Sequence, residues 1–454
     1  MSDNDQRRSV VDEYGNIHYL TEELARGGQG VVFRTEDPDL AIKQPLENGC
    51  PDTNVNVTDV FSRVRTLPLP RGVPISLPLA ILRNEPGYVM KLLNGMKSFE
   101  SFSLDGAMRQ KIADEAPPEW LAGVSDRKLA QDLFYYSKTG STRRRLYALY
   151  KCAAVLARIH NAGIVYCDIS DKNVFIGDDI PGDCWLIDAD NLRLELPNGG
   201  KSVYTRFFGA PEIVQGKDAS RPRTDCWAFA VLAFQTLALC HPFIGKKVMD
   251  SNVGWDAEPP ADGMPSDLDE QAYAGYLPFI DDDEDDSNEL PGGGLPRMLV
   301  LTPKLRKLFQ ETFGIGRTAP HRRPSMMFWA RELSIAFDHS IVCPGCGMSY
   351  FDGPDFAHCP YCQLKQPAYV IAKTNRGQMY LPISGNGVFE VRLPRRLFHP
   401  FSPIDGDACE YEAEIDPARK MVLPVRGTKP FPDGLEFEFA NSDRLELANA
   451  EGSK

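Results

Sequence analysis

The chain has 454 residues, a length at which a single hydrophobic core usually gives way to two or three domains. Its formal net charge of -13 at pH 7 argues against broad electrostatic attraction to nucleic acid or to anionic lipid. No stretch is long and apolar enough to cross a bilayer, and the polar segment Met1 to Val11 lacks the apolar core of an export signal. We therefore expect a cytoplasmic protein that binds neither membrane nor nucleic acid.

The 11 cysteines fall into two groups. Seven are scattered, several beside apolar runs, which is typical of free thiols in a reducing compartment. The other four form two Cys-x-x-Cys pairs, Cys343 with Cys346 and Cys359 with Cys362. Two such turns can supply four thiolates to one tetrahedral ion, so we predict a structural Zn²⁺ site. Two redox-active pairs or two disulfides are the alternatives, and the adjacent His358 is not needed as a ligand.

The first ninety or so residues predict short strands separated by turns. Val31–Phe33 and Leu40–Ile42 are rich in strand-forming residues, and the turn-like Asp37–Asp39 lies between them. From Arg144 to Ile159 apolar residues recur at helical spacing, which predicts a long amphipathic helix. Trp227 to Leu239 is apolar nearly all round, which predicts a buried helix. Further helices are expected at Leu305–Phe313 and Met326–Phe337.

Two segments interrupt this order of a β-rich part followed by a helical part. One is polar and lies near residues 98–142; the other, near 246–296, is rich in Asp, Pro and Gly. We expect its acidic run, Asp281 to Asp286, to be a solvated, mobile loop, and Arg143–Arg145 to be a solvated helix start. After the cysteine pairs, Val388–Leu393 and Leu435–Phe439 alternate with period two, which predicts a small antiparallel β domain.

A glycine-rich turn lies near the N-terminus, between Leu24 and Val32. Glycines there would let backbone N–H groups approach phosphates with no side chain in the way. Lys43 follows at the end of the apolar Ala41-Ile42 and could bridge phosphate oxygens. Neither feature is specific alone, because glycine turns and surface lysines are common.

Three polar side chains follow the predicted long helix at loop and strand ends. Asp168 and Asn173 lie in a loop between apolar runs, and Asp188 ends the run Trp185-Leu186-Ile187. Phosphoryl transfer needs mainly positioning and charge neutralisation, for which carboxylate and amide oxygens hold Mg²⁺. A further carboxylate can orient the attacking hydroxyl and accept its proton.

Together these motifs resemble those of the protein kinase superfamily over roughly residues 15–340. Gly209-Ala210-Pro211-Glu212, Asp225-Cys226-Trp227 and Arg323 also match, and the resemblance implies that Arg323 pairs with Glu212. The implied fold class is α+β: a bilobal kinase domain (residues 1–340), a zinc ribbon (341–366) and a small β-rich domain (367–454). The small lobe would span about 15–93 and the large lobe about 94–340, with inserts near 98–142 and 246–296.

The resemblance also implies roles for individual residues. Asp168 would be the catalytic base, Asn173 and Asp188 would hold Mg²⁺, Lys43 would hold the α- and β-phosphates of ATP, and Lys172 would reach the γ-phosphate. Ser202 and Thr205 are candidates for self-phosphorylation. The other residues expected to contact the nucleotide are Ala25 in place of the first glycine, Gly27, Gly28, Gly30, Val32, Ala41, Met90 as gatekeeper, and Lys91, Leu92 and Leu93 as the hinge.

The sequence departs from the family at several positions. Tyr166-Cys167 replaces a His-Arg pair, so a phosphate on the activation segment would lack its usual arginine. Ala189 and Asp190 replace the Phe and Gly that follow the metal-binding Asp. The acidic partner of Lys43 has no clear match between Asn54 and Leu67, where Asp59 is the nearest candidate.

The leading hypothesis is an ATP- and Mg²⁺-dependent Ser/Thr protein kinase acting on a protein partner and on itself. The alternatives are a nucleotide-binding pseudokinase that recruits partners through the ribbon and β domain, and a nucleic-acid-binding module, which the net charge disfavours. The order of the parts and the segment Tyr276–Asp283 resemble bacterial kinases of tellurite-resistance-type stress systems. That resemblance implies a von Willebrand A-type protein and a metal-dependent phosphatase as partners.

Overall fold

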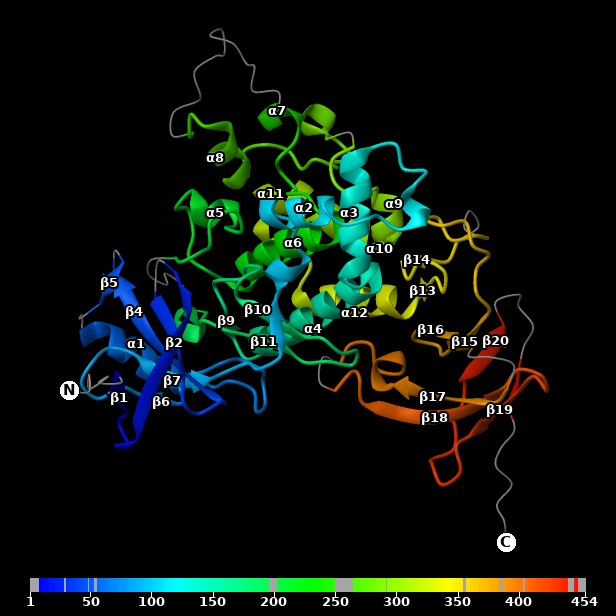
Figure 1. Cartoon of the computed structure of the whole chain (residues 1–454), viewed down its shortest axis with the longest axis horizontal. Helices are drawn as coiled ribbons and strands as arrows, with labels where there is room; N and C mark the ends of the chain where they lie inside the picture. Colours follow the sequence, from blue (N-terminus) through cyan, green and yellow to red (C-terminus); the bar gives the residue numbers. More distant parts are fainter. Residues whose placement is uncertain are drawn as a thin grey trace.

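Figure 1 shows N-terminal strands, a central group of helices and a second group of strands at the C-terminal end. The computed structural model describes residues 8–27, 30–47, 49–52, 55–195, 202–249, 264–290, 292–353, 357–383, 387–402, 405–439 and 445–447. In this part of the chain no helix is of a length and apolarity that would span a bilayer.

The N-terminal sheet is antiparallel, with strand order β1-β2-β3-β4-β7-β6 and β5 paired to β4. It begins at Ser9, earlier than the predicted boundary near residue 15. The helix α1 follows β5. The bounds are β1 (Ser9–Val11), β2 (Ile17–Arg26), β3 (Gly30–Thr35), β4 (Leu40–Glu47), β5 (Cys50–Pro51), α1 (Val55–Arg65), β6 (Ala80–Ile81) and β7 (Tyr88–Lys91).

The helices that follow surround the largest buried cluster of the molecule. The long helix α4 (Ser141–Asn161) and the buried helix α6 (Pro222–Ala238) both form where the sequence predicts them. The other long helices are α3 (Arg127–Lys138) and α12 (Met326–Asp338), and the predicted helix at Leu305–Phe313 is α10 (Pro303–Gln310) continued by the π-helical η5 (Glu311–Ile315). Apolar side chains all round α6 are buried because the other helices cover every face of it.

Shorter elements connect these helices. Between β7 and Leu194 the short elements are β8 (Met96–Ser98), η1 (Phe99–Phe102), α2 (Gly106–Ala113), η2 (Glu119–Leu121), β9 (Ile164–Val165), β10 (Val174–Gly177), β11 (Cys184–Leu186), η3 (Ala189–Asn191) and β12 (Arg193–Leu194). After them come α5 (Pro211–Val214), α7 (Lys246–Met249), α8 (Leu268–Tyr273), η4 (Asp286–Asn288), α9 (Arg297–Val300), α11 (Gly316–Thr318) and η6 (Pro320–Arg322).

The arginines at the start of α4 contradict the prediction of a solvated helix start. Arg145 is 0% exposed; its Nε donates to Thr236 O at 2.9 Å, and its guanidinium lies 3.8 Å from the centre of the Tyr136 ring. The Nη1 of Arg143 donates to Phe337 O at 2.8 Å. Hydrogen bonds to carbonyls and stacking on aromatic rings make burial of these guanidinium groups tolerable.

The acidic run is also more ordered than predicted. Asp281 forms an ion pair with Arg297 at 2.6 Å, and the preceding Phe279 and Ile280 are buried in the main core. Only its later part, around Asp283, is exposed. Buried aromatic and aliphatic side chains therefore fix one end of the run, so the prediction of a mobile loop is wrong for Asp281.

The C-terminal strands form three sheets. A hairpin of β13 (Ser340–Val342) and β14 (Ser349–Phe351) comes first, then the sheet β16-β15-β20 and the sheet β17-β18-β19-β21. One pair, β19 with β21, is parallel, so the expected antiparallel domain is corrected at this edge. The bounds are β15 (Tyr369–Lys373), β16 (Gln378–Pro382), β17 (Phe389–Pro394), η7 (Arg395–Leu397), β18 (Cys409–Asp416), β19 (Met421–Pro424), β20 (Glu436–Phe439) and β21 (Glu446–Leu447).

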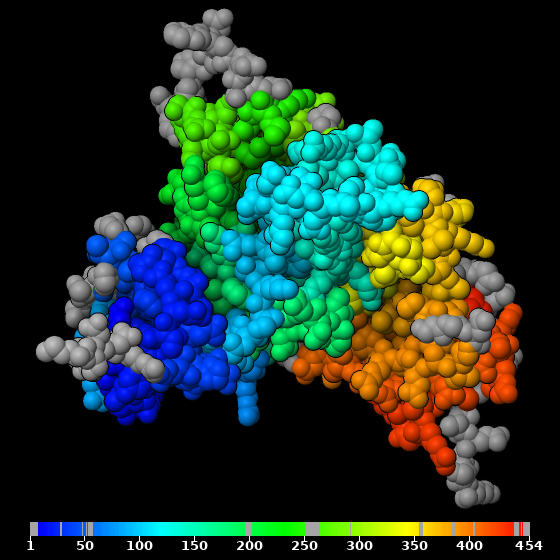
Figure 2. Space-filling model, viewed as in Figure 1, coloured from blue at the N-terminus to red at the C-terminus, as the bar shows by residue number. Residues whose placement is uncertain are grey.

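A buried ion-pair network joins these strands to the helices. Arg396, from η7, donates Nη2 to Asp338 Oδ1 at 2.7 Å and Nη1 to Asp407 Oδ1 at 2.5 Å. Asp407 also accepts from Tyr147 and Lys151 of α4, at 2.8 Å each. In Figure 2 the orange residues of the C-terminal part accordingly lie directly against the rest of the chain. Because Arg396 is 8% exposed, removing it would leave two carboxylates at a buried interface.

We predict that Arg396→Ala lowers the free energy of unfolding by about 3–5 kcal/mol, the usual effect of breaking a buried ion pair. Urea denaturation followed by circular dichroism measures this value. Arg395→Ala is the matched control, since Arg395 is exposed on the same turn. Equal denaturation midpoints for the two variants would contradict the structural role of Arg396.

Candidate functional site

A buried carboxylate on α6 holds the loop between β9 and β10. Asp225 Oδ2 accepts from Tyr166 N at 2.8 Å, and its Oδ1 accepts from Cys167 N at 2.9 Å. Its Oδ2 also lies 2.9 Å from His160 Nε2. Cys167 has φ 76°, a left-handed conformation that is strained for a residue with a side chain. The two hydrogen bonds to Asp225 fix this conformation and thereby aim the next residue, Asp168.

Asp168, Asn173 and Asp188 lie together, as the motifs predict. Asn173 Nδ2 donates to Asp168 O at 2.9 Å and to Asp168 Oδ2 at 3.2 Å, and Ile187 N donates to Asn173 O at 3.0 Å. Asp188 adopts a left-handed conformation, with φ 53°, at the end of β11. Burial raises the pKa of Asp168; the Thr205 hydrogen bond opposes this rise, and the charge of Asp188 adds to it.

Lys43 on β4 reaches the same place from the N-terminal sheet. Its Nζ lies 3.0 Å from Asp188 Oδ1 and 2.6 Å from Asp190 Oδ2, while its side chain is 4% exposed. Burial alone would lower the pKa of Lys43, but the charges of Asp190 and Asp188 outweigh burial and raise the pKa above its usual range. The nearest predicted partner, Asp59, is instead exposed on α1.

The glycine-rich turn connects β2 and β3, and its Gly30 lies close to the side chain of Lys43. Gly27 N donates to Gly30 O at 2.9 Å, and Gly28 lies outside the described residues. A Cβ at Gly30 would come within 3.1 Å of Lys43 Cε and 3.0 Å of Gln44 O, so close approach of the two strands favours glycine there. Val32 is the cross-strand partner of both Ala25 and Lys43.

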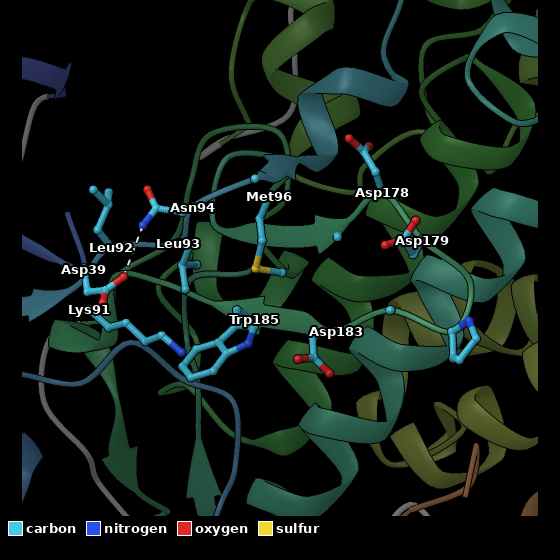
Figure 3. A pocket seen from close by; sticks show the side chains of 14 residues that line it. Asp39, Lys91, Leu92, Leu93, Asn94, Met96, Asp178, Asp179, Asp183 and Trp185 are labelled. Atoms are coloured by element: carbon cyan, nitrogen blue, oxygen red, sulfur yellow. Dashed lines mark hydrogen bonds between the residues drawn. The ribbon is translucent and has the colours of Figure 1, made fainter. Parts of the chain in front are cut away.

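The predicted gatekeeper and hinge lie at the end of β7. Met90 is buried and is the cross-strand partner of Ala41. The Leu92 N–H donates to Asp39 O at 2.8 Å, and Lys91 O accepts from the Ser76 hydroxyl at 3.3 Å. Figure 3 shows a pocket lined by this segment and by Trp185, where the ammonium of Lys91 lies 4.3 Å from the centre of the Trp185 ring.

Three other predicted residues, Lys172, Thr205 and Ser202, differ in how they lie relative to Asp168. Lys172 is 71% exposed, with its Nζ 3.7 Å from Glu100, so no hydrogen bond in the described structure joins it to Asp168. Thr205 donates to Asp168 Oδ1 at 2.6 Å, which places its hydroxyl on the predicted catalytic carboxylate. Ser202 Oγ accepts from Ser220 N at 3.1 Å.

Two features of the site were not predicted. Asp190 was recognised as replacing a glycine but not as the partner of Lys43. Arg193 of β12 donates from Nε to Cys167 Sγ at 3.1 Å. It thus brings a guanidinium to Cys167, the residue that replaces the arginine of the family. A buried lysine needs a nearby anion, so a search of the whole chain for an extra carboxylate could have found Asp190.

The predicted pair between Glu212 and Arg323 is confirmed. Arg323 donates Nη1 to Glu212 Oε1 at 2.7 Å and Nη2 to Glu212 Oε2 at 2.8 Å, in a bidentate arrangement. Its side chain is 0% exposed, and the guanidinium lies 4.9 Å from the centre of the Trp227 ring. This contact joins Glu212 of α5 to α6 and to the turn before α12.

The four predicted cysteines form a cluster, with the first pair in the turn between β13 and β14 and the second pair between β14 and β15. Their sulfur atoms all lie within 4.8 Å of one another, with Cys343 Sγ 3.5 Å from Cys362 Sγ and Cys346 Sγ 3.6 Å from Cys359 Sγ. Sulfurs of a tetrahedral site with Zn–S bonds of about 2.3 Å lie about 3.8 Å apart, so the cluster fits Zn²⁺. Free cysteines at these distances also mean that the described structure contains no disulfide there.

The two cysteine turns have the same backbone design. Gly347 N donates to Cys343 O, and Gln363 N donates to Cys359 O, at 2.9 Å in each case. Both donors have positive φ, 72° for Gly347 and 60° for Gln363. This geometry turns both sulfurs of each pair to one side. Tyr361, within the second turn, packs against Trp120 with ring centres 6.2 Å apart and so fastens the cluster to the predicted insert.

Comparison with known protein families gives a match over part of the chain. Residues 125–258 match the family model of the protein kinase domain. This segment contains Asp168, Asn173, Asp188 and Glu212, whereas Lys43 and the glycine-rich turn precede it.

Several curated proteins are similar to the chain. Serine/threonine-protein kinase pkn2 of Myxococcus xanthus is 33% identical over 109 residues, which are 22% of this chain and 13% of that protein. Protein kinase C-like 1 of Candida albicans is 33% identical over 124 residues, 25% of this chain and 11% of that protein. The mitogen-activated protein kinase hog1 of Aspergillus terreus is 29% identical over 100 residues, 22% of this chain and 27% of that protein.

The chain therefore spans only about an eighth of the length of the first of these relatives, 13%. The matched segment is therefore similar to protein kinase domains, and these relatives are named as protein kinases.

We predict that Cys359→Ser abolishes zinc binding, because three thiolates and a hydroxyl hold Zn²⁺ far less well than four thiolates. Atomic absorption spectrometry of the purified proteins should give stoichiometric zinc in the parent and little in the variant. Cys409→Ser is the control, since Cys409 is exposed and outside the cluster. Equal zinc content in all three proteins, or none in the parent, would contradict the site.

Proposed function

We propose that the protein is an ATP- and Mg²⁺-dependent kinase that transfers the γ-phosphate to Ser or Thr side chains of a protein partner. The observation that carries this proposal is the meeting of Lys43, from the N-terminal sheet, with Asp188, next to Asn173 and Asp168. Sequence segments far apart in the chain thus supply one cation and three oxygen-bearing groups at one place, the set that phosphoryl transfer uses.

Each of these side chains would have a distinct task. Asp168 would accept the proton of the substrate hydroxyl, and the Thr205 hydroxyl, 2.6 Å from Asp168 Oδ1, marks where a hydroxyl can bind that carboxylate. Lys43 would steady the α- and β-phosphates, since it is fixed by ion pairs and stays protonated. Lys172 is proposed for the γ-phosphate only if its exposed side chain turns inward from Glu100.

Asn173 and Asp188 are the proposed ligands of Mg²⁺. The amide nitrogen of Asn173 donates to Asp168, which leaves its oxygen as the acceptor available to a cation. Carboxylate and amide oxygens fit a hard divalent ion. When bound, Mg²⁺ would neutralise phosphate charge during transfer.

The C-terminal parts are proposed to recruit partners. On this proposal residues 1–340 form the bilobal kinase domain, 341–366 the zinc ribbon and 367–454 the β-rich domain. Strands β15 to β20 enclose a buried cluster of their own, which supports a separate domain. The order of these parts underlies the proposal that a von Willebrand A-type protein is the substrate and a metal-dependent phosphatase the antagonist.

We predict that Asp168→Asn abolishes phosphate transfer, since the substrate hydroxyl then has no base near it. Purified protein incubated with γ-labelled ATP should label itself or a candidate partner, as measured by autoradiography. Asp179→Asn is the control, because Asp179 is exposed on the turn after β10.

Equal labelling by the parent and by Asp168→Asn would contradict the catalytic assignment. Nucleotide binding by calorimetry with no transfer to any partner would instead support a pseudokinase scaffold.

The raised pKa of Asp168 leads to a prediction about pH. Asp168 acts as a base only when ionised, so activity should be lost as the pH falls through its pKa and be fully present above it. Because the Thr205 hydrogen bond lowers that pKa, Thr205→Val should move the acid limb of the kcat/KM profile to higher pH. Ser202→Ala, which does not touch Asp168, should leave the limb in place; a limb that moves to lower pH in Thr205→Val would refute the assignment.

A further inference from the structure

A lysine as deeply buried as Lys43 needs a fixed anion beside it. The small helix α1 supplies none among the described side chains: Asp59 is exposed, and the ion pairs of Lys43 run to Asp188 and Asp190. Asp190 lies in η3, the short helix whose N-cap residue is Asp188, and is 147 residues from Lys43 in the chain. The anion thus comes from the same turn that carries the proposed metal ligand.

Asp190 is itself held in place from the N-terminal sheet. Tyr88 on β7 is the cross-strand partner of Lys43, so both side chains leave the sheet on the same face. The Tyr88 hydroxyl donates to Asp190 Oδ1 at 2.8 Å, while Lys43 Nζ lies 2.6 Å from Asp190 Oδ2. Both carboxylate oxygens are therefore occupied by neighbours from one sheet, which fixes the position of the carboxylate.

Helix α1 contributes to this arrangement through an aromatic contact instead of a charge. Phe61 on α1 packs edge-on against the Tyr88 ring, with ring centres 4.7 Å apart, and both side chains are at most 2% exposed. The helix thus supports the tyrosine that holds Asp190. Lys43 keeps its charged partners without any carboxylate from the helix.

We propose that Asp190 is the positioning residue for Lys43, taking the place of a helix carboxylate, so that the phosphate-binding lysine is held without an ion pair to α1. This inference rests on the proposed kinase function. Two carboxylates on one lysine have a purpose in this arrangement: Asp188 can turn to the metal while Asp190 stays on Lys43. A swing of α1 would then not switch the site off by breaking a lysine–carboxylate pair.

The test compares Asp190→Asn, Asp190→Glu and Asp59→Asn in the full chain. Asp190→Asn should weaken the binding of Mg²⁺-free ADP about tenfold, equivalent to the loss of one modest ionic contact, and should lower kcat/KM for ATP by at least as much. Asp190→Glu should recover part of both, since it restores the charge. Asp59→Asn should match the parent in both measurements. Melting temperatures followed by circular dichroism report whether each variant is folded.

Two outcomes would overturn the proposal. If Asp59→Asn loses as much as Asp190→Asn, the helix supplies the partner after all. If Asp190→Asn changes only the Mg²⁺ concentration needed for half-maximal activity and not ADP affinity, Asp190 is a metal ligand. If the parent binds ADP but transfers no phosphate, the kinase proposal fails, whereas the ADP measurements still decide the role of Asp190. Tyr88→Phe, which removes only the hydroxyl on Asp190, should show an intermediate loss of ADP affinity.

Discussion

The buried carboxylate of Asp225 is the constraint on which the proposed active site depends. It takes two backbone N–H groups of the loop that precedes Asp168, and the surrounding helices keep it 1% exposed. Hydrogen bonds to a charged acceptor contribute about 1.5–3 kcal/mol each, enough to offset the strained backbone at Cys167. Because Asp225 lies on α6, a helix buried along most of its length, the loop takes its position from the main core.

The C-terminal parts are built onto the same framework rather than attached by a flexible connection. Ser349, in the hairpin beside the cysteines, accepts a hydrogen bond from Arg143 N. Arg396 forms an ion pair with Asp338 at the end of α12, and Asp407 forms one with Lys151 in the middle of α4. Helix α4 ends shortly before the loop that Asp225 holds. A partner bound to the C-terminal strands would therefore contact a part of the protein that packs against the helix leading into this loop, which favours recruitment close to the proposed site.

Sequence reasoning predicted those features that are local or that depend on fixed residue types. The all-round apolar pattern of α6 identified a buried helix, and the Glu212–Arg323 pair followed from two motifs. The partner of Lys43 was not predicted because it was expected within the segment 54–67, whereas Asp190 lies in η3, 147 residues further along the chain. Arg145 was misjudged because three arginines in a row suggest solvent, although Arg145 is four residues before Leu149 and so lies on the apolar face of α4. The parallel pairing of β21 left no pattern in the sequence, since alternation shows a strand but not its neighbour.

The charges at the site have a further consequence for the chemistry. Asp168, Asp188 and Asp190 face one lysine within a partly buried space, so the site carries an excess of negative charge even though burial raises the pKa of Asp168. The phosphates of a nucleotide would be repelled from such a site unless divalent cations accompanied them. In the family pattern a glycine stands where this chain has Asp190, but the family also has an acidic residue on the small-lobe helix that has no clear match in this chain, so Asp190 replaces one negative charge at the lysine. Divalent cations are therefore needed beside the phosphates because of the three carboxylates together, while Asp190 itself favours phosphate binding by holding Lys43 in position.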